Sequence, residues 1–301
     1  MRRRFNIFKM IFCSAITLGL VCVFTNSKDS QQEVFSAIKS NYINYSKDLN
    51  VVSESKLSLK NINDINLDLD VDDVTFLENT EDKIKIVEKC NRELSEKEQL
   101  KIEEGDNSIN IYRNSKLDIN SVAKSFKREL LIYLPSSYNK NLNVTLSIGD
   151  INFTSDLNLE NLEIYLSTGD VNIDKNVNCK SFIAESSTGD MNINYLSANS
   201  YGIGLNTGSV DVSTLLGQGY INITTGDIKC GISNLTGNTE LSSSIGDITV
   251  NIQKENKLLL DTSCDIGEVD TDFKSNSIGK NPKNILKVKC GCGDIKINKN
   301  Y

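Results

Sequence analysis

The chain has 301 residues without His or Trp, which excludes a Ser-His-Asp or Cys-His nucleophile and a His-ligated zinc or iron centre. It carries 33 basic and 40 acidic residues, and because four basic residues precede position 10, residues 26–301 hold a net charge of −11. A surface this acidic argues against nucleic acid and anionic lipid as partners, and it leaves cationic, neutral or cation-bridged partners.

Residues 1–27 have the pattern of a targeting segment. The basic stretch "MRRRFNIFK" precedes the uncharged apolar stretch 10–24, "MIFCSAITLGLVCVF". This stretch is short for a membrane span and suits the apolar core of a signal sequence. Positive charge before it predicts that the N-terminus stays cytoplasmic and that the rest is exported. Two alternatives stay open: an uncleaved anchor that holds an extracytoplasmic domain at the cytoplasmic membrane, or a cleaved signal that releases a secreted protein.

Two segments separate the targeting segment from the regular part of the chain. Residues 28–50 are expected to form a tether with a short helix, because Ser30 and Glu33 have capping-box spacing. Residues 51–140 are expected to form an N-terminal β cap built on a degenerate repeat unit. In its stretch "INLDLDVDDVTF", Asp72 stands where later units have Gly. Terminal units of solenoids are atypical in this way.

Residues 141–301 contain a repeat marked by Gly, followed in most copies by Asp. The copies are spaced by 18–26 residues, mostly near 20, and a sustained period of this size is typical of a solenoid. Two residues after each Gly the chain is apolar and three after it is polar, which is the period of a half-buried strand. The predicted fold is an all-β parallel β-helix or β-solenoid with about eight coils of about 20 residues. The turn glycines are Gly149, Gly169, Gly189, Gly208, Gly226, Gly246, Gly267 and Gly293.

The alternative all-β fold is a sandwich, which would need antiparallel hairpins, and the uniform phase of the units argues against it. The side-chain phase shifts at each Gly, as a corner between two strands requires. Counting from Gly, positions −7, −5, −3 and −1 are expected to point inward, followed by +2 and +4. Gly tolerates positive φ at the corner. The residues at −1, expected to stack in one inward column, are Ile148, Thr168, Thr188, Thr207, Thr225, Ile245, Ile266 and Cys292.

The acids after the glycines form a second column. Stacking at the strand spacing of about 4.8 Å makes these carboxylates repel unless they face water, accept backbone hydrogen bonds or share cations. Turn chemistry and a Ca²⁺-binding ladder are the two interpretations, and the missing nonapeptide of calcium-binding rolls favours turn chemistry. Nothing singles out two acids as a glycosidase pair. The candidates are Asp150, Asp170, Asp190, Asp227, Asp247 and Asp294, with Ser209 and Glu268 at the remaining corners.

Cys264 and Cys290 occupy the same position, −3, in consecutive units. Stacking would bring their Cα atoms within disulfide range, so this pair is a disulfide candidate that would close the loop around "SNSIGKNPKN". The alternative is that both are reduced and pack as small apolar side chains. The stretch "CGCGD" lacks a second pair at the spacing of a zinc site.

The last unit, "GDIKINKNY", is expected to form the open C-terminal edge of the solenoid. Lys296 and Lys299 would blunt this exposed strand edge. Because no cap is recognisable after it, the edge is also expected to be a place where a partner can dock.

"RELLIYLP" followed by "STGDVNI" and "STGDMNI" resembles the bacterial putative-adhesin family of β-strand-repeat proteins, a domain family of unknown function. The resemblance covers about residues 55–300. It implies a β-helical fold, an envelope or surface location and, often, an N-terminal membrane segment, and some members are encoded beside envelope stress-response systems. The family has no agreed catalytic residues. This chain departs from the motif at Ser209 and Glu268, which replace Asp.

These features predict a non-enzymatic, extracytoplasmic, adhesin-like protein that presents a rigid acidic solenoid to an envelope polymer or a surface protein. It would be held at the membrane by residues 10–24. The alternative is an accessory or regulatory protein of a cell-envelope stress response that binds a membrane protein or a cationic peptide. No cofactor is expected beyond the Ca²⁺ considered above.

Overall fold

The computed structural model describes residues 48–114, 126–255 and 257–301, and these residues form twenty strands and no helix. The all-β prediction is therefore confirmed for them. The chain divides into two units, 1–46 and 47–301, and the fold described here is that of the second. The predicted targeting segment 1–27 and the tether up to residue 47 lie outside the described residues. Within the described part, no helix could cross a membrane.

The strands follow one another along the chain with short connections. They are β1 (Asn50–Ser58), β2 (Asp64–Val71), β3 (Asp73–Asn79), β4 (Lys83–Cys90), β5 (Leu100–Glu104), β6 (Ser108–Arg113), β7 (Arg128–Pro135), β8 (Asn141–Ile148), β9 (Ile151–Phe153), β10 (Leu157–Thr168), β11 (Val171–Thr188), β12 (Met191–Thr207), β13 (Val210–Thr225), β14 (Ile228–Ile245), β15 (Ile248–Ile252), β16 (Leu258–Ile266), β17 (Val269–Thr271), β18 (Ser277–Ile278), β19 (Asn284–Cys292) and β20 (Ile295–Lys299).

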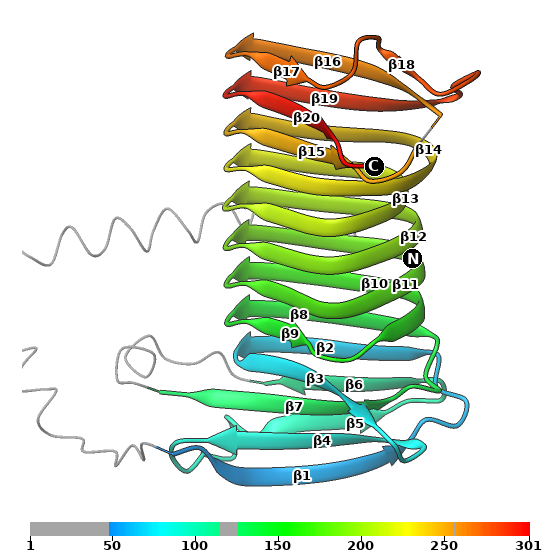
Figure 1. The fold of residues 1–301 in the computed structure, drawn as a ribbon. Coiled ribbons are helices and arrows are strands. Elements are labelled where there is room, and N and C mark those ends of the chain that lie inside the picture. The colour runs from blue at the N-terminus through cyan, green and yellow to red at the C-terminus, as the bar shows by residue number, and fades with distance from the viewer. Residues whose placement is uncertain (1–47, 115–125, 256) are drawn as a thin grey trace, which may run out of the picture. The chain divides into compact units, whose positions relative to one another are not determined.

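Strands on either side of the corners form two ladders, and we call one strand pair around a corner a rung. The first ladder, formed by the strand segments before each corner, runs β5–β6–β2–β8–β10–β11–β12–β13–β14–β19–β16–β18. The second, after each corner, runs β1–β4–β7–β3–β9–β11–β12–β13–β14–β15–β20–β17. Neighbouring rungs pair in parallel, and the antiparallel pairs lie near the two ends of the stack (Figure 1).

The core lies between the two ladders and is built from the apolar columns. Residues at −7, −5 and −3, and at +2 and +4, are buried in the interior rungs, as in Leu162, Ile164, Leu166, Val171 and Ile173. Alternation of side chains along each strand explains this arrangement, because every second residue faces the opposite ladder. The inward pattern predicted for these five positions is confirmed.

The prediction for position −1 is wrong, because these residues are exposed. The exposed fractions of Ile148, Ile245 and Ile266 are 44%, 56% and 69%, and the four threonines of this column are also exposed. The strand leaves its regular alternation two residues before Gly, and the pairing between rungs skips that position. The chain has begun to turn at −1, so its side chain points to solvent at the corner.

The last two rungs are stacked in the reverse of their chain order. Gly246 N donates to Cys292 O at 2.9 Å, and Gly293 N donates to Ile266 O at 2.9 Å. The rung of β19 and β20 therefore lies between the rung of β14 and β15 and the rung of β16 and β17 (Figure 1). The longer connection 272–283 gives the chain enough length to return.

This reversal corrects the prediction for the open edge. The strand β20 lies between β15 and β17, so Lys296 has a strand partner on both sides, whereas Lys299 pairs only with Ile252 of β15. The terminal rung is β16–β17. At the other end, the predicted degenerate unit is confirmed, because β2 and β3 pair in register with β8 and β9. Strands β4–β7 are inserted in sequence between these partners. The predicted boundary at residue 140 between cap and repeats stays a prediction.

Candidate functional site

The corner glycines form a ladder that only Gly can occupy. All eight have positive φ, between 130° and 144°. A Cβ built on Gly189 would lie 1.9 Å from the carbonyl oxygen of Gly169, and the other seven would meet the preceding rung as closely. Both the backbone conformation and the close approach exclude a side chain. The glycines predicted from the sequence are therefore structural residues of the stack.

The acid column bonds one rung to the next. Asp150 Oδ1 accepts the N–H of Asp170 at 2.9 Å, and Asp170 Oδ1 accepts the N–H of Asp190 at 2.8 Å. The same bond recurs along the stack through Asp190, Asp227, Asp247 and Asp294. This is the turn chemistry considered for the column, except that the amide belongs to the next rung rather than to the same turn. The sequence alone does not distinguish these two bonding patterns, because both place an acid after Gly.

A metal site is not apparent in the acid column. Within residues 48–114, 126–255 and 257–301, no three His, Cys, Asp or Glu side chains come together as a metal ion requires. One oxygen of most column carboxylates is already used by a backbone amide. The Ca²⁺ ladder stays a prediction that a chelator experiment can test.

Asparagine side chains form further ladders on the outer faces. Asn172 Nδ2 donates to Asn152 Oδ1 at 3.0 Å, and Asn192 Nδ2 donates to Asn172 Oδ1 at 3.1 Å. A similar chain of bonds joins Asn161 to Asn141. Each ladder fixes the amide orientation at the spacing of the strands. The outer surface therefore repeats the same polar groups from rung to rung.

A buried ion cluster lies at the corner where Asp replaces Gly. Asp72 accepts hydrogen bonds from Arg113 Nε at 2.9 Å and from Arg128 Nε at 2.7 Å. Arg113 Nη1 also reaches Glu88 Oε1 at 2.8 Å. The four side chains are almost completely buried, and Arg128 also donates to the carbonyl of Val71. Two cations and two anions balance within the cluster, which ties β6 and β7 to the first corner.

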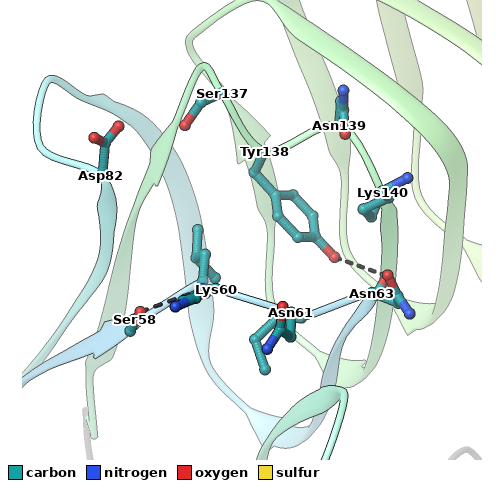
Figure 2. Close-up of a pocket in the computed structure, with 11 residues that line it drawn as sticks. Ser58, Lys60, Asn61, Asn63, Asp82, Ser137, Tyr138, Asn139 and Lys140 are labelled. Carbon is teal, nitrogen blue, oxygen red and sulfur yellow. Dashed lines mark hydrogen bonds between the residues drawn. The ribbon is translucent and has the colours of Figure 1, made fainter.

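A pocket of about 450 Å³ lies beside the turn between β1 and β2 (Figure 2). Tyr138 points into its wall, with its hydroxyl 3.1 Å from Asn63 O and 2.6 Å from Asn141 O. Burial, followed by the nearby Asp64 carboxylate, raises the pKa of Tyr138, so the hydroxyl stays protonated and committed to backbone. The other polar groups around it include Lys60 and Lys140. The pocket could hold a small polar group, but its tyrosine is a structural anchor.

The cysteines are free thiols in the described residues. Cys264 and Cys290 are register partners on β16 and β19, as their shared position −3 predicts. The Cys264 thiol lies 3.0 Å from Gly293 O, and the Cys290 thiol lies 3.1 Å from Gly246 O. Burial, then Cys264, raises the pKa of Cys290 to about 11, and burial raises the pKa of Cys179 to about 12. Such thiols are poor nucleophiles at neutral pH. The disulfide between Cys264 and Cys290 stays a prediction.

Several solved structures resemble this chain, and 13 chains match in all. A putative adhesin from Parabacteroides distasonis is 14% identical with a TM-score of 0.51, and the match covers 85% of this chain and 99% of that one. A putative adhesin from Bacteroides fragilis is 15% identical with a TM-score of 0.45 over 84% and 98% of the two chains. At this identity the first of these supports the fold alone. No curated protein matches the sequence.

The family comparison covers most of the chain. The model of the family described as Toastrack DUF4097 matches residues 62–298, which include every rung from β2 to β20. This span agrees with the resemblance found in the repeated "STGD" motif. The chain belongs to the Toastrack DUF4097 family.

Proposed function

We propose that this protein is a non-enzymatic, extracytoplasmic interaction protein. It would present a rigid, acidic β-solenoid of about eight coils, with an N-terminal β cap, to an envelope polymer or a surface protein. Residues 10–24 would direct it to the cytoplasmic membrane, as an anchor or as a cleaved signal.

The repetition of polar groups on the outer faces carries this proposal. The asparagine ladder from Asn152 to Asn192 and the exposed threonine column from Thr168 to Thr225 run across consecutive rungs in register. A regular surface of this kind matches an extended ligand by area and repetition rather than by one pocket. The committed hydroxyl of Tyr138 and the protonated thiols of Cys179 and Cys290 support a role without catalysis. The name of the Parabacteroides distasonis protein that this chain resembles in fold, a putative adhesin, agrees with it.

Co-sedimentation tests the proposal. The purified full chain is mixed with the producing organism's protein-free wall polymer and, separately, with its membranes, with Ca²⁺ or with chelator. We expect saturable pelleting with the polymer. Binding only to membranes, lost after protease treatment of those membranes, would favour the regulatory alternative. Pelleting with neither material would contradict the proposal, and loss with chelator would establish the cation ladder.

Two pairs of substitutions show which face binds. The pair Asn172→Lys and Asn192→Lys changes the outer face of the second ladder and adds two positive charges. The pair Glu163→Gln and Glu185→Gln changes the outer face of the first ladder and removes two negative charges, so the net charge changes by the same amount. Each pair is the control for the other. Binding by one face predicts that one pair reduces pelleting several-fold while the other leaves it unchanged.

A further inference from the structure

The terminal rung, residues 258–272, leaves core columns of the stack without cover. Val269 stands in the +2 column and is 41% exposed, whereas Ile248 and Ile295 in the two preceding rungs are fully buried. On β16, Thr262 and Cys264 are only partly buried, although their partners Val288 and Cys290 lie in the core. The stack therefore ends on an apolar edge rather than on a cap.

The backbone of this rung also has unused strand-pairing groups. In each interior rung the N–H of the corner Gly and the N–H two residues later donate to the following rung, as Gly293 N does to Ile266 O and Ile295 N to Glu268 O. The corresponding N–H groups of Gly267 and Val269 point away from the stack, and no described strand follows them. Strand β18 pairs with Leu258 and Leu259, and Asn276 O accepts the N–H of Leu260 at 2.7 Å, so the open part of the edge begins at residue 261. The edge can accept one more strand.

The charges of the edge select the kind of strand. Residues 258–272 hold five acids and no Lys or Arg. In the first ladder, Glu240, Lys287 and Asp261 are register partners on three successive rungs. In the second, Lys296 is the register partner of Asp270. At these two positions a base on the β19–β20 rung faces an acid on the terminal rung. A strand beyond Asp261 and Asp270 pairs favourably with these acids when it carries Lys or Arg.

We propose that the terminal rung is a docking edge that takes an extended basic segment of another polypeptide as an added strand. Main-chain hydrogen bonds would supply affinity, and lysines or arginines opposite Asp261 and Asp270 would supply specificity. A second copy of this chain fits less well, because edge-to-edge pairing would place acids against acids. This proposal rests on the proposed function, because it names a class of partner for the same solenoid.

A labelled peptide tests the proposal on the full chain. The probe is a fluorescent decapeptide, Lys-Val-Thr-Val-Ser-Thr-Gly-Ser-Val-Lys, whose Gly falls opposite Gly267 and whose two lysines fall opposite Asp261 and Asp270. Its counterpart has Glu in place of Lys. Fluorescence anisotropy should show saturable binding of the Lys probe and none of the Glu probe. The variant Asp261→Asn with Asp270→Asn should weaken binding at least tenfold. The matched variant Asp174→Asn with Glu185→Gln, which changes two exposed acids on β11 by the same net charge, should change it less than twofold.

A backbone-modified probe leaves the protein unchanged and so remains informative if a variant folds poorly. The first threonine and the last lysine of the probe have peptide N–H groups that face the terminal rung, because alternate residues of each strand donate to the preceding rung and the others to the following one. N-methylation of these two residues removes the donors and should abolish binding by an added strand. Equal weakening by both variants, unchanged binding of the methylated probe, or no saturable binding would overturn the proposal. Sedimentation of the free chain as a dimer that excludes the Lys probe would also overturn it, because a second copy would then occupy the edge. If the peptide does not bind but the chain still pellets with wall polymer, only the docking edge is rejected. If the peptide binds but the chain does not pellet with wall polymer, only the proposed function is rejected.

Discussion

In the rung of β2 and β3 the corner residue is Asp72, whereas the other eight rungs have Gly at the equivalent place. The carbonyl of Asp72 contacts Gly149 as the carbonyl of Gly169 contacts Gly189. The rung of Asp72 is the first in the series of corners. No carbonyl from the corner of a preceding rung therefore occupies the space of its side chain. That space holds Arg113 and Arg128.

Asp72 also lacks the positive φ of the eight glycines, so its corner differs from theirs in backbone conformation as well as in stacking. A rung that follows another rung must admit a carbonyl where Cβ would stand. The first rung is free of this requirement and uses the position for an ion cluster that joins the inserted strands to the stack.

Removing Asp72 should break the first corner. The substitution Asp72→Ala leaves Arg113 and Arg128 buried with fewer acceptors, and loss of one partner from a buried ion group costs about 3–5 kcal/mol. Urea unfolding measures the change in free energy. In the double variant Asp72→Ala with Arg128→Met, the charges balance again, and most of the loss should be recovered. A change below about 1 kcal/mol in the single variant would show that the cluster does not hold the cap.

Placing a side chain at an interior corner should cost nearly as much. For Gly189→Ala we expect a loss of about 3 kcal/mol, because a strained φ adds to the clash with the carbonyl of Gly169. Thr188→Ala, one residue away and exposed, is the control and should stay within about 0.5 kcal/mol. Equal effects of both substitutions on the unfolding midpoint would contradict the stacking requirement.

A second ion pair of the N-terminal region should make stability depend on pH. The hydrogen bond from Arg92 lowers the pKa of Glu98 from 4.5 to about 2. A lowered pKa in the folded state means that this contribution is present above pH 4.5 and disappears as the pH falls towards 2. The free energy of unfolding of Glu98→Gln should be about 1–2 kcal/mol lower than that of the parent at pH 7. The two proteins should become equally stable as the pH approaches 2. A constant difference across this range would disprove the linkage.

The break in the acid column can be repaired. Ser209 offers no carboxylate to the next rung, whereas Asp190 accepts the N–H of Ser209 at 2.7 Å. Ser209→Asp should stabilise the stack by about 0.5–1 kcal/mol through a new bond to the amide of Asp227. The reciprocal variant Asp170→Ala should lose about 1 kcal/mol. Thermal unfolding measures both, and destabilisation by Ser209→Asp would mean that repulsion between column acids outweighs the bond.

The cysteines should differ in reactivity with little effect on stability. Cys292 is exposed at its corner, whereas Cys230 is fully buried and burial raises its pKa. Iodoacetamide should therefore label Cys292 first and Cys230 only after unfolding. Peptide mapping without reductant also tests the predicted disulfide, since a bond would protect both Cys264 and Cys290 from the reagent in denaturant. Early labelling of Cys230 would contradict the buried assignment.

The sequence by itself determined the columns of the stack. Positions such as Val171 and Ile173 were recognisable as core because a period of two is a direct consequence of strand geometry. The corner glycines were recognisable because they recur at one spacing. Position −1 was not, since Thr and Ile suit both an inward column and an exposed corner.

Only the tertiary structure decided the order of the rungs and the partners of Asp72. Local pattern assigns a segment to a rung, but every rung has the same pattern, so it cannot say which rung lies beside which. That choice depends on the connection 272–283 and on the inserted strands β4–β7, which let distant segments become neighbours. Arg113 and Arg128 lie 41 and 56 residues from Asp72, and only the fold brings their charges together.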